Sequence, residues 1–212
     1  RSTDWNNSLW VKIYPINADG SQISDDYIRQ LSVEQFSGIE AFVSREVERY
    51  GRDLKRPVRM ELGTLINEQP PELPDAYNKL KVMWWSLRMR WWAHRVASPT
   101  DFPLENSVGL QKGMVGIVNG FAGRRHDGSN NVIITHEFLH TLGATDKYEA
   151  ANGLPRFPDG YGEPDREPRY PQRFAEIMGG RIALADDDAV IPRNLKYVLI
   201  GAQTAAEIRL AP

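Results

Sequence analysis

The 212-residue chain contains no cysteine, and this absence limits the sites that it can build. Without thiols it forms neither a disulfide nor a cysteine-ligated zinc site. The absence of cysteine does not reveal the cellular compartment of the protein, because many exported bacterial proteins also lack cysteine. Histidine is scarce too, since only His94, His126, His136 and His140 are present. A metal site that takes a further ligand after His140 must therefore take it from a carboxylate.

Long apolar runs and a strong charge of one sign are also missing. No stretch approaches the roughly 20 apolar residues of a membrane helix, so we expect this chain to be soluble. A net charge of −2 leaves no basic footprint, and no nucleic-acid partner is expected. The 41% of hydrophobic residues suits one compact domain or two lobes that share a cleft. Because the chain begins at Arg1, we expect any signal or membrane anchor to lie upstream.

The most informative stretch runs from Asn130 to Tyr148 and reads NNVIITHEFLHTLGATDKY. If it is helical, His136 and His140 lie one turn apart on one face, which is the spacing that two ligands of one zinc ion require. Glu137 is next to the first histidine, where its carboxylate can take a proton from a metal-bound water without binding the metal. Apolar flanks predict a buried helix. The alternative is a surface helix with two incidental histidines.

The end of this helix suggests where a third ligand comes from. Gly143 is a natural helix stop, because glycine takes left-handed backbone angles at little cost. Asp146, three residues later, can then turn back to the metal. Catalytic zinc keeps three protein ligands and one open position, so Asp146 is the expected third ligand. Glu149 and the upstream His126 are the alternatives.

The segment HEFLHTLGATD resembles the extended signature HExxHxxGxxH/D of the metzincin clan of zinc peptidases, in the snapalysin-like form with aspartate as third ligand. Met178, in AEIMGG, matches the methionine turn that metzincins place beneath the metal. The close resemblance covers about a tenth of the chain. The wider pattern resembles uncharacterised bacterial proteins with an exported or membrane-anchored zincin domain. No tyrosine soon follows Met178, so the extra tyrosine ligand of some members has no counterpart.

This resemblance implies an α+β, zincin-like fold, with a mixed twisted β-sheet, long helices that include the active-site helix, and a smaller irregular C-terminal lobe. Residues 1–143 are expected to form the N-terminal subdomain with the sheet and the active-site helix. Residues 144–212 are expected to hold the third ligand, the methionine turn and a final helix. The implied function is a secreted or periplasmic zinc-dependent endopeptidase that acts on a peptide or protein substrate.

Periodicity predicts the remaining elements. Strands are expected at 9–16, 57–66 and 110–122, and helical pieces between 24 and 51. The strand at 110–122 is either an edge next to the active-site helix, where an extended substrate pairs, or an ordinary inner strand. Near the C-terminus, 197–200 is strand-like and 204–210 is a short helix.

The segment from Asp75 to Val96 is expected to be a helix that contains four tryptophans. The following residues share a helical spacing that predicts a core face: Leu80, Trp84, Leu87 and Trp91. The other two tryptophans mark a contact surface, a membrane-proximal face or a second packed side. His94, on this helix, is expected to be structural rather than a ligand.

The segment between Asp146 and Met178 is rich in proline and glycine, and such a long loop is usually functional. The resemblance implies that it forms the lower wall of the cleft and returns the chain beneath the metal. Tyr148 or Tyr161 could donate a hydrogen bond to the developing oxyanion, although a buried packing role is the commoner one for a tyrosine.

The alternative to an enzyme is a catalytically silent zincin-fold module that binds or scaffolds peptides. The presence of Glu137 argues against it, because a purely structural site has no use for a general base. A metal-dependent hydrolase of other bonds, such as an amide in cell-wall peptides, is a third reading.

Overall fold

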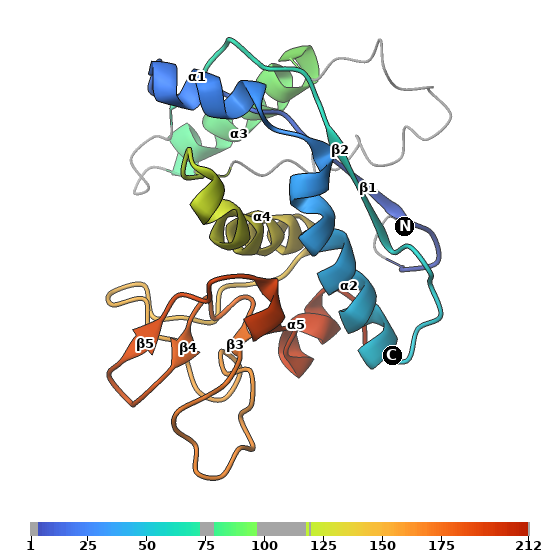
Figure 1. Cartoon of the computed structure of the whole chain (residues 1–212), viewed down its shortest axis with the longest axis vertical. Helices are drawn as coiled ribbons and strands as arrows, with labels where there is room; N and C mark the ends of the chain where they lie inside the picture. Colours follow the sequence, from blue (N-terminus) through green and yellow to red (C-terminus); the bar gives the residue numbers. More distant parts are fainter. Residues whose placement is uncertain (1–3, 73–78, 97–117, 119, 212) are drawn as a thin grey trace. The chain divides into compact units, whose positions relative to one another are not determined.

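The computed structural model describes residues 4–72, 79–96, 118 and 120–211 (Figure 1). Helices and strands are mixed along the chain, so the predicted α+β class is confirmed. By its internal contacts the chain divides into two units: Arg1–Val11, Ser32–Glu61 and Gly116–Pro212 form the first, and Lys12–Leu31 and Leu62–Val115 form the second. Residues on both sides of Gly143, where a subdomain boundary is predicted, lie in the first unit.

The strands of the described residues form three two-stranded sheets instead of one larger mixed sheet. β1 (Leu9–Ile13) pairs with β2 (Val58–Leu62). The pairs near the C-terminus are β3 (Ala175–Glu176) parallel to β6 (Val198–Leu199), and β4 (Ile182–Ala183) antiparallel to β5 (Ala189–Val190). Most of the strand predicted at 110–122 lies outside the described residues.

The first unit has its core between two helices and the C-terminal segment (Figure 1). A 3₁₀ turn, Val33–Phe36, leads into α2 (Ser37–Arg49). An apolar stripe lies along this segment, and its side chains are all buried: Phe36, Ile39, Phe42, Val43 and Val47. α2 contacts α4 (Asp127–Leu142) and the 3₁₀ turn Leu195–Tyr197. This packing fixes the helix that carries the HExxH motif.

The C-terminal segment is tied to α2 by polar contacts as well as by packing. The Arg45 guanidinium donates to the Val198 carbonyl at 2.6 Å, and the buried Glu46 carboxylate accepts from Ile200 N at 2.9 Å. The predicted final strand and helix are present as β6 and as α5 (Ala202–Glu207), although the helix starts two residues earlier than expected.

The second unit contains α1 (Gln22–Arg29) and α3 (Lys79–Val96). The Ser21 hydroxyl caps α1 by accepting from Ser24 N at 3.1 Å, so this helix begins earlier than Ser24. A small core lies along α3: Ile66, Met89, Trp92 and Ala93, with Tyr14, Ile16, Trp85 and Val96 packed against it.

The core face predicted for α3 is wrong. Trp84, Leu87 and Trp91 are exposed, whereas Trp92 is buried and Trp85 is partly buried. Both sets have a helical spacing, so periodicity alone does not choose between them. Met89 and Ala93 extend the second set and make its face continuous. The placement of the His94 side chain lies outside the described structure.

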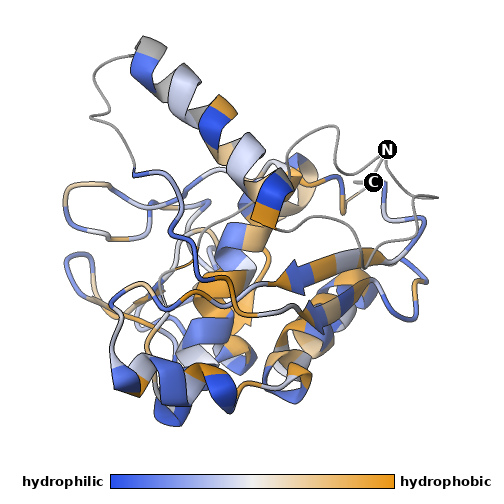
Figure 2. Cartoon of the chain, turned by 90° about the horizontal axis from the view of Figure 1, so that it is seen from above, coloured by the Kyte–Doolittle hydropathy of each residue, from blue (hydrophilic) through white to orange (hydrophobic). Residues whose placement is uncertain are grey.

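Hydrophilic and hydrophobic residues are mixed on the helices (Figure 2). Among the described residues, no helix combines the length and the apolar character that crossing a bilayer requires.

Candidate metal centre

The HExxH motif lies in the second half of α4. The helix begins at Asp127, after a 3₁₀ turn at Arg124–His126. Asn130 instead uses its side-chain amide to hold the backbone of Phe121, accepting from Phe121 N at 3.0 Å and donating to its carbonyl at 2.9 Å. These two bonds tie the first turns of the helix to the segment that precedes it.

Gly143 ends the helix as predicted. Its φ of 110° lies in the left-handed region, where glycine is the favoured residue. Its N–H donates to the His140 carbonyl at 3.0 Å, and Ala144 N donates to the Leu139 carbonyl at 3.1 Å. This turn reverses the chain, so the residues after it run back alongside the histidines.

Two imidazole nitrogens and one carboxylate oxygen meet at the edge of α4. His136 Nε2 and His140 Nε2 are 3.1 Å apart, and Asp146 Oδ1 lies 3.2 Å from the first and 3.1 Å from the second. In a tetrahedral zinc site with ligand distances of about 2.0–2.1 Å, neighbouring ligand atoms are about 3.3 Å apart. The nearly equilateral triangle therefore fits three ligands of one small cation.

The protonation of the two imidazoles follows from their other nitrogens. His136 Nδ1 donates to the Ile177 carbonyl at 2.9 Å, and His140 Nδ1 donates to the Ala144 carbonyl at 2.8 Å. Because a carbonyl only accepts, each neutral ring carries its hydrogen on Nδ1 and an unshared electron pair on Nε2. A backbone carbonyl on the second nitrogen is also the usual way to orient a metal-binding histidine.

Asp146 Oδ1 is the feature of this cluster that hydrogen bonding does not explain. The atom is buried and has no hydrogen-bond partner among the described residues. It faces two Nε2 atoms that are themselves acceptors. Three electron-rich atoms in contact repel each other unless a cation or a proton lies between them. The donor set therefore fits a bound metal ion.

Glu137 lies beside this cluster. One oxygen of its carboxylate and one ring nitrogen each of His136 and His140 all lie within 4.8 Å of one another. This reach is one that a single bridging water can span. His140 and Asp146 are partly open to solvent, with side chains 30% and 44% exposed. Water and a substrate group can therefore approach from that side.

The chain after Asp146 is held by the turn that contains Met178. Lys147 N donates to the Met178 carbonyl at 2.9 Å, and the neighbouring Ile177 carbonyl accepts from His136. Met178 is completely buried. The structure thus brings the turn at Met178 next to His136 and Asp146, although that turn comes much later in the sequence.

Glu176 supports this turn, and sequence reasoning missed it. Its carboxylate is completely buried and accepts four hydrogen bonds: from Met178 N at 2.6 Å, Gly179 N at 2.8 Å, Gly201 N at 3.0 Å and Thr204 Oγ1 at 2.7 Å. Burial raises the pKa of Glu176, against the opposing effect of these donors. The available sequence signal was an acidic residue in the otherwise apolar run AEIM.

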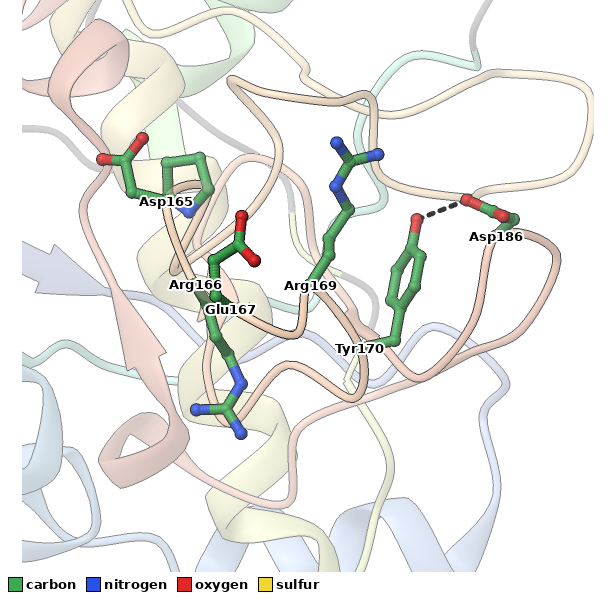
Figure 3. A pocket seen from close by; sticks show the side chains of 7 residues that line it. Asp165, Arg166, Glu167, Arg169, Tyr170 and Asp186 are labelled. Atoms are coloured by element: carbon green, nitrogen blue, oxygen red, sulfur yellow. Dashed lines mark hydrogen bonds between the residues drawn. The ribbon is translucent and has the colours of Figure 1, made fainter.

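The two tyrosines predicted near the site differ in their surroundings. The Tyr148 ring centroid lies 6.3 Å from that of His136, and burial, followed by the charge of Asp146, raises the pKa of Tyr148. The Tyr161 hydroxyl is 2.7 Å from that of Tyr170. Tyr170 donates to the Asp186 carboxylate (Figure 3), so the single Tyr161 proton is used on Tyr170. Of the two, Tyr148 is the one beside the cluster, and a hydrogen bond to Asp146 also contributes to its raised pKa.

The hollow around Tyr170 shares no residue with the cluster of His136, His140 and Asp146. It is lined by Pro164, Asp165, Arg166, Glu167, Arg169, Tyr170 and Asp186 (Figure 3). None of these residues belongs to the histidine cluster.

The rival third ligands, His126 and Glu149, have other surroundings. The His126 ring packs on Phe121 with centroids 5.1 Å apart, and its Nε2 accepts from Arg125 Nε at 3.0 Å. Glu149 is exposed, and its backbone N donates to the Leu154 carbonyl at 2.8 Å. Of the three carboxylate and imidazole candidates, Asp146 is the one in contact with both histidines.

No protein-family model, no curated protein and no solved structure matches this chain. Its function must therefore be inferred from the chemistry of the site.

Proposed function

We propose that this chain is a zinc-dependent endopeptidase of the metzincin type, with a zincin-like fold. His136, His140 and Asp146 hold the metal. The supporting observation is the triangle of two Nε2 atoms and a buried Oδ1 without a hydrogen-bond partner among the described residues, with edges of 3.1–3.2 Å. A cation relieves the repulsion in this triangle, and Asp146 Oδ1 has no hydrogen-bond partner among the described residues.

The donor set favours zinc over hard cations. Calcium and magnesium prefer oxygen ligands, whereas imidazole suits zinc and other transition metals. Two histidines and a carboxylate also hold iron(II) in oxygenases. Glu137 favours the hydrolytic assignment, because a general base next to the metal serves the activation of water.

Each residue has a defined role in the proposed hydrolysis. Bound zinc supplies a Lewis acid for the substrate carbonyl and lowers the pKa of water. Glu137 takes the proton from the attacking water and returns it to the leaving nitrogen. The carbonyls of Ile177 and Ala144 keep both Nε2 atoms directed at the centre. Tyr148 donates a hydrogen bond to the developing oxyanion.

The decisive experiment combines metal analysis with cleavage of a peptide library. The purified chain should contain about one zinc per molecule and should cut peptides, and a chelator should stop the cutting. Glu137→Gln should keep the metal while slowing turnover by a factor of at least about 10². His140→Ala should lose the metal.

Three results would count against this proposal. A Glu137→Gln variant that cuts as fast as the parent excludes the general-base role. A His140→Ala variant that retains zinc with unchanged affinity excludes the ligand set. A parent that binds zinc and peptides but never cuts them supports the silent binding module instead.

A further inference from the structure

One face of α3 exposes large apolar side chains to solvent. Trp84 is 65% exposed, Leu87 52% and Trp91 64%. These residues are three and four positions apart, so they form one stripe along the helix. The opposite face packs into the small core of the second unit through Met89 and Trp92. The stripe is therefore additional to the residues that this helix needs for its own packing.

The same helix is strongly basic. Its 18 residues, KLKVMWWSLRMRWWAHRV, include five lysines and arginines and no acidic residue. Subtracting these five from the 26 basic residues of the chain leaves 21 against 28 acidic ones, so the rest of the chain carries a net charge of −7 and α3 carries +5. The positive charge of this helix is thus opposite in sign to that of the remaining sequence.

The exposed cations lie next to the apolar stripe. Arg88 and Arg95 are both exposed, and the Arg95 guanidinium lies 4.6 Å from the centroid of the Trp91 ring. Arg95 also pairs with Glu68, but both side chains are about half exposed, and such surface pairs contribute little. An aromatic stripe bordered by guanidinium groups combines the two chemistries found at the headgroup level of a bilayer.

We propose that the face of α3 formed by Trp84, Leu87, Arg88, Trp91 and Arg95 docks on the surface of an anionic lipid bilayer. The tryptophans and Leu87 enter the boundary between headgroups and acyl chains, and the arginines bind lipid phosphates. Charge complementarity selects this partner. An anionic leaflet attracts the net charge of +5 on α3, whereas an uncharged apolar surface does not. This docking is peripheral and does not depend on the metal chemistry.

Vesicle co-sedimentation of the full chain tests the proposal. The parent should bind vesicles that contain phosphatidylglycerol much more strongly than vesicles of phosphatidylcholine alone, and added salt should weaken the binding. One basic residue near an anionic surface contributes about fivefold in affinity. Arg88→Glu removes one positive charge and adds one negative charge, so it should weaken binding about 25-fold. The triple variant Trp84→Ser, Leu87→Ser, Trp91→Ser should reduce the partition coefficient at least about tenfold.

Two matched controls should bind like the parent. Ile23→Ser removes an apolar side chain of the second unit that is 73% exposed but lies on α1. Lys55→Glu reverses an exposed charge outside α3.

Other occupants of the face predict different results, and each would overturn the proposal. If the stripe is covered by another part of the chain, the triple variant loses thermal stability relative to Ile23→Ser, and the parent binds no vesicles. If a second copy covers it, the parent is a dimer that the triple variant dissociates. Equal binding of the parent to both kinds of vesicle removes the electrostatic argument.

Discussion

Replacing Glu176 by glutamine tests how the metal centre depends on a residue that does not touch it. The carboxylate holds two segments at once, the turn at Met178 and Gly179 and the start of α5 at Gly201 and Thr204. Glutamine has the same shape but offers one oxygen and one NH₂ group. With its oxygen on Met178 N and Gly179 N, its NH₂ group faces the N–H of Gly201.

The magnitude follows from this mismatch. A buried donor that loses its acceptor costs about 1–3 kcal/mol. Because burial raises the pKa of Glu176, its carboxylate already carries a desolvation cost that glutamine avoids, which offsets part of the loss. We expect Glu176→Gln to lower the free energy of unfolding by about 1–2 kcal/mol. Glu176→Ala removes all four acceptor contacts and should cost about 3–6 kcal/mol.

The same substitution should weaken metal binding. The Ile177 carbonyl, which orients His136, lies between the two ends of the turn that Glu176 holds. Loss of such an outer contact typically reduces metal affinity by about 10–100-fold. Cobalt(II) titration reports both the affinity and, through its visible spectrum, the ligand geometry, and urea unfolding with a chelator present reports the stability of the metal-free chain.

Glu46→Gln is the matched control. Glu46 is also completely buried in the first unit and accepts from Arg49 and from Ile200 N, but among the described residues it makes no hydrogen bond to the turn that contains Met178. It should lose stability and keep the parent's cobalt affinity and spectrum. If Glu176→Gln binds cobalt like the parent, or if both variants lose affinity equally, Glu176 acts only through global stability and the reasoning is refuted.

Three further predictions address the third metal ligand, the end of α4 and the loss of stability at low pH. Asp146→Asn should lower zinc affinity about 100-fold in chelator competition, whereas Glu149→Gln should leave it unchanged. Gly143→Ala places a Cβ at a φ of 110° and should lower the free energy of urea unfolding by about 1–2 kcal/mol; an unchanged midpoint would contradict the left-handed turn. Burial by itself raises the pKa of Glu207, but hydrogen bonds from Lys147 and Thr145 outweigh it and lower this pKa from 4.5 to about 2. Since the folded pKa is the lower one, about 3 kcal/mol of stability is present above pH 4.5 and lost as pH falls towards 2, and Glu207→Gln should flatten that loss.

Local signals in the sequence account for what could be predicted. The stop at Gly143, the shared face of His136 and His140 and the buried stripe of α2 all depend on residues within a few turns of each other. Such short-range patterns determine where a helix ends and which face is apolar. They do not determine the tertiary partner, and the buried face of α3 shows the limit. Two tryptophan pairs with the same spacing gave two equivalent faces, and packing against Ile66 decided between them.

The third ligand shows the same limit at the site. The sequence alone left Asp146, Glu149 and His126 as candidates for the third ligand, because each lies close in sequence to one end of the helix that carries the histidines. The structure separates them through contacts with residues distant in sequence: Lys147 pairs with Met178 and with Glu207, and His126 packs on Phe121. No pattern within the motif contains this information.

These contacts imply that α4 alone does not make the metal centre. The helix supplies two nitrogens at one face. Asp146 Oδ1 reaches them only because the segment that follows the helix is held from both sides. On one side Lys147 N binds the Met178 carbonyl, and on the other the Glu207 carboxylate accepts from Thr145 N at 2.9 Å and from Lys147 Nζ at 2.8 Å. Glu207 ends α5, whose first residues are fixed by Glu176, the same carboxylate that shapes the turn orienting His136. One buried acid and one partly buried acid therefore connect both sides of the triangle, so opening of the C-terminal segment should release the metal before α4 itself unfolds.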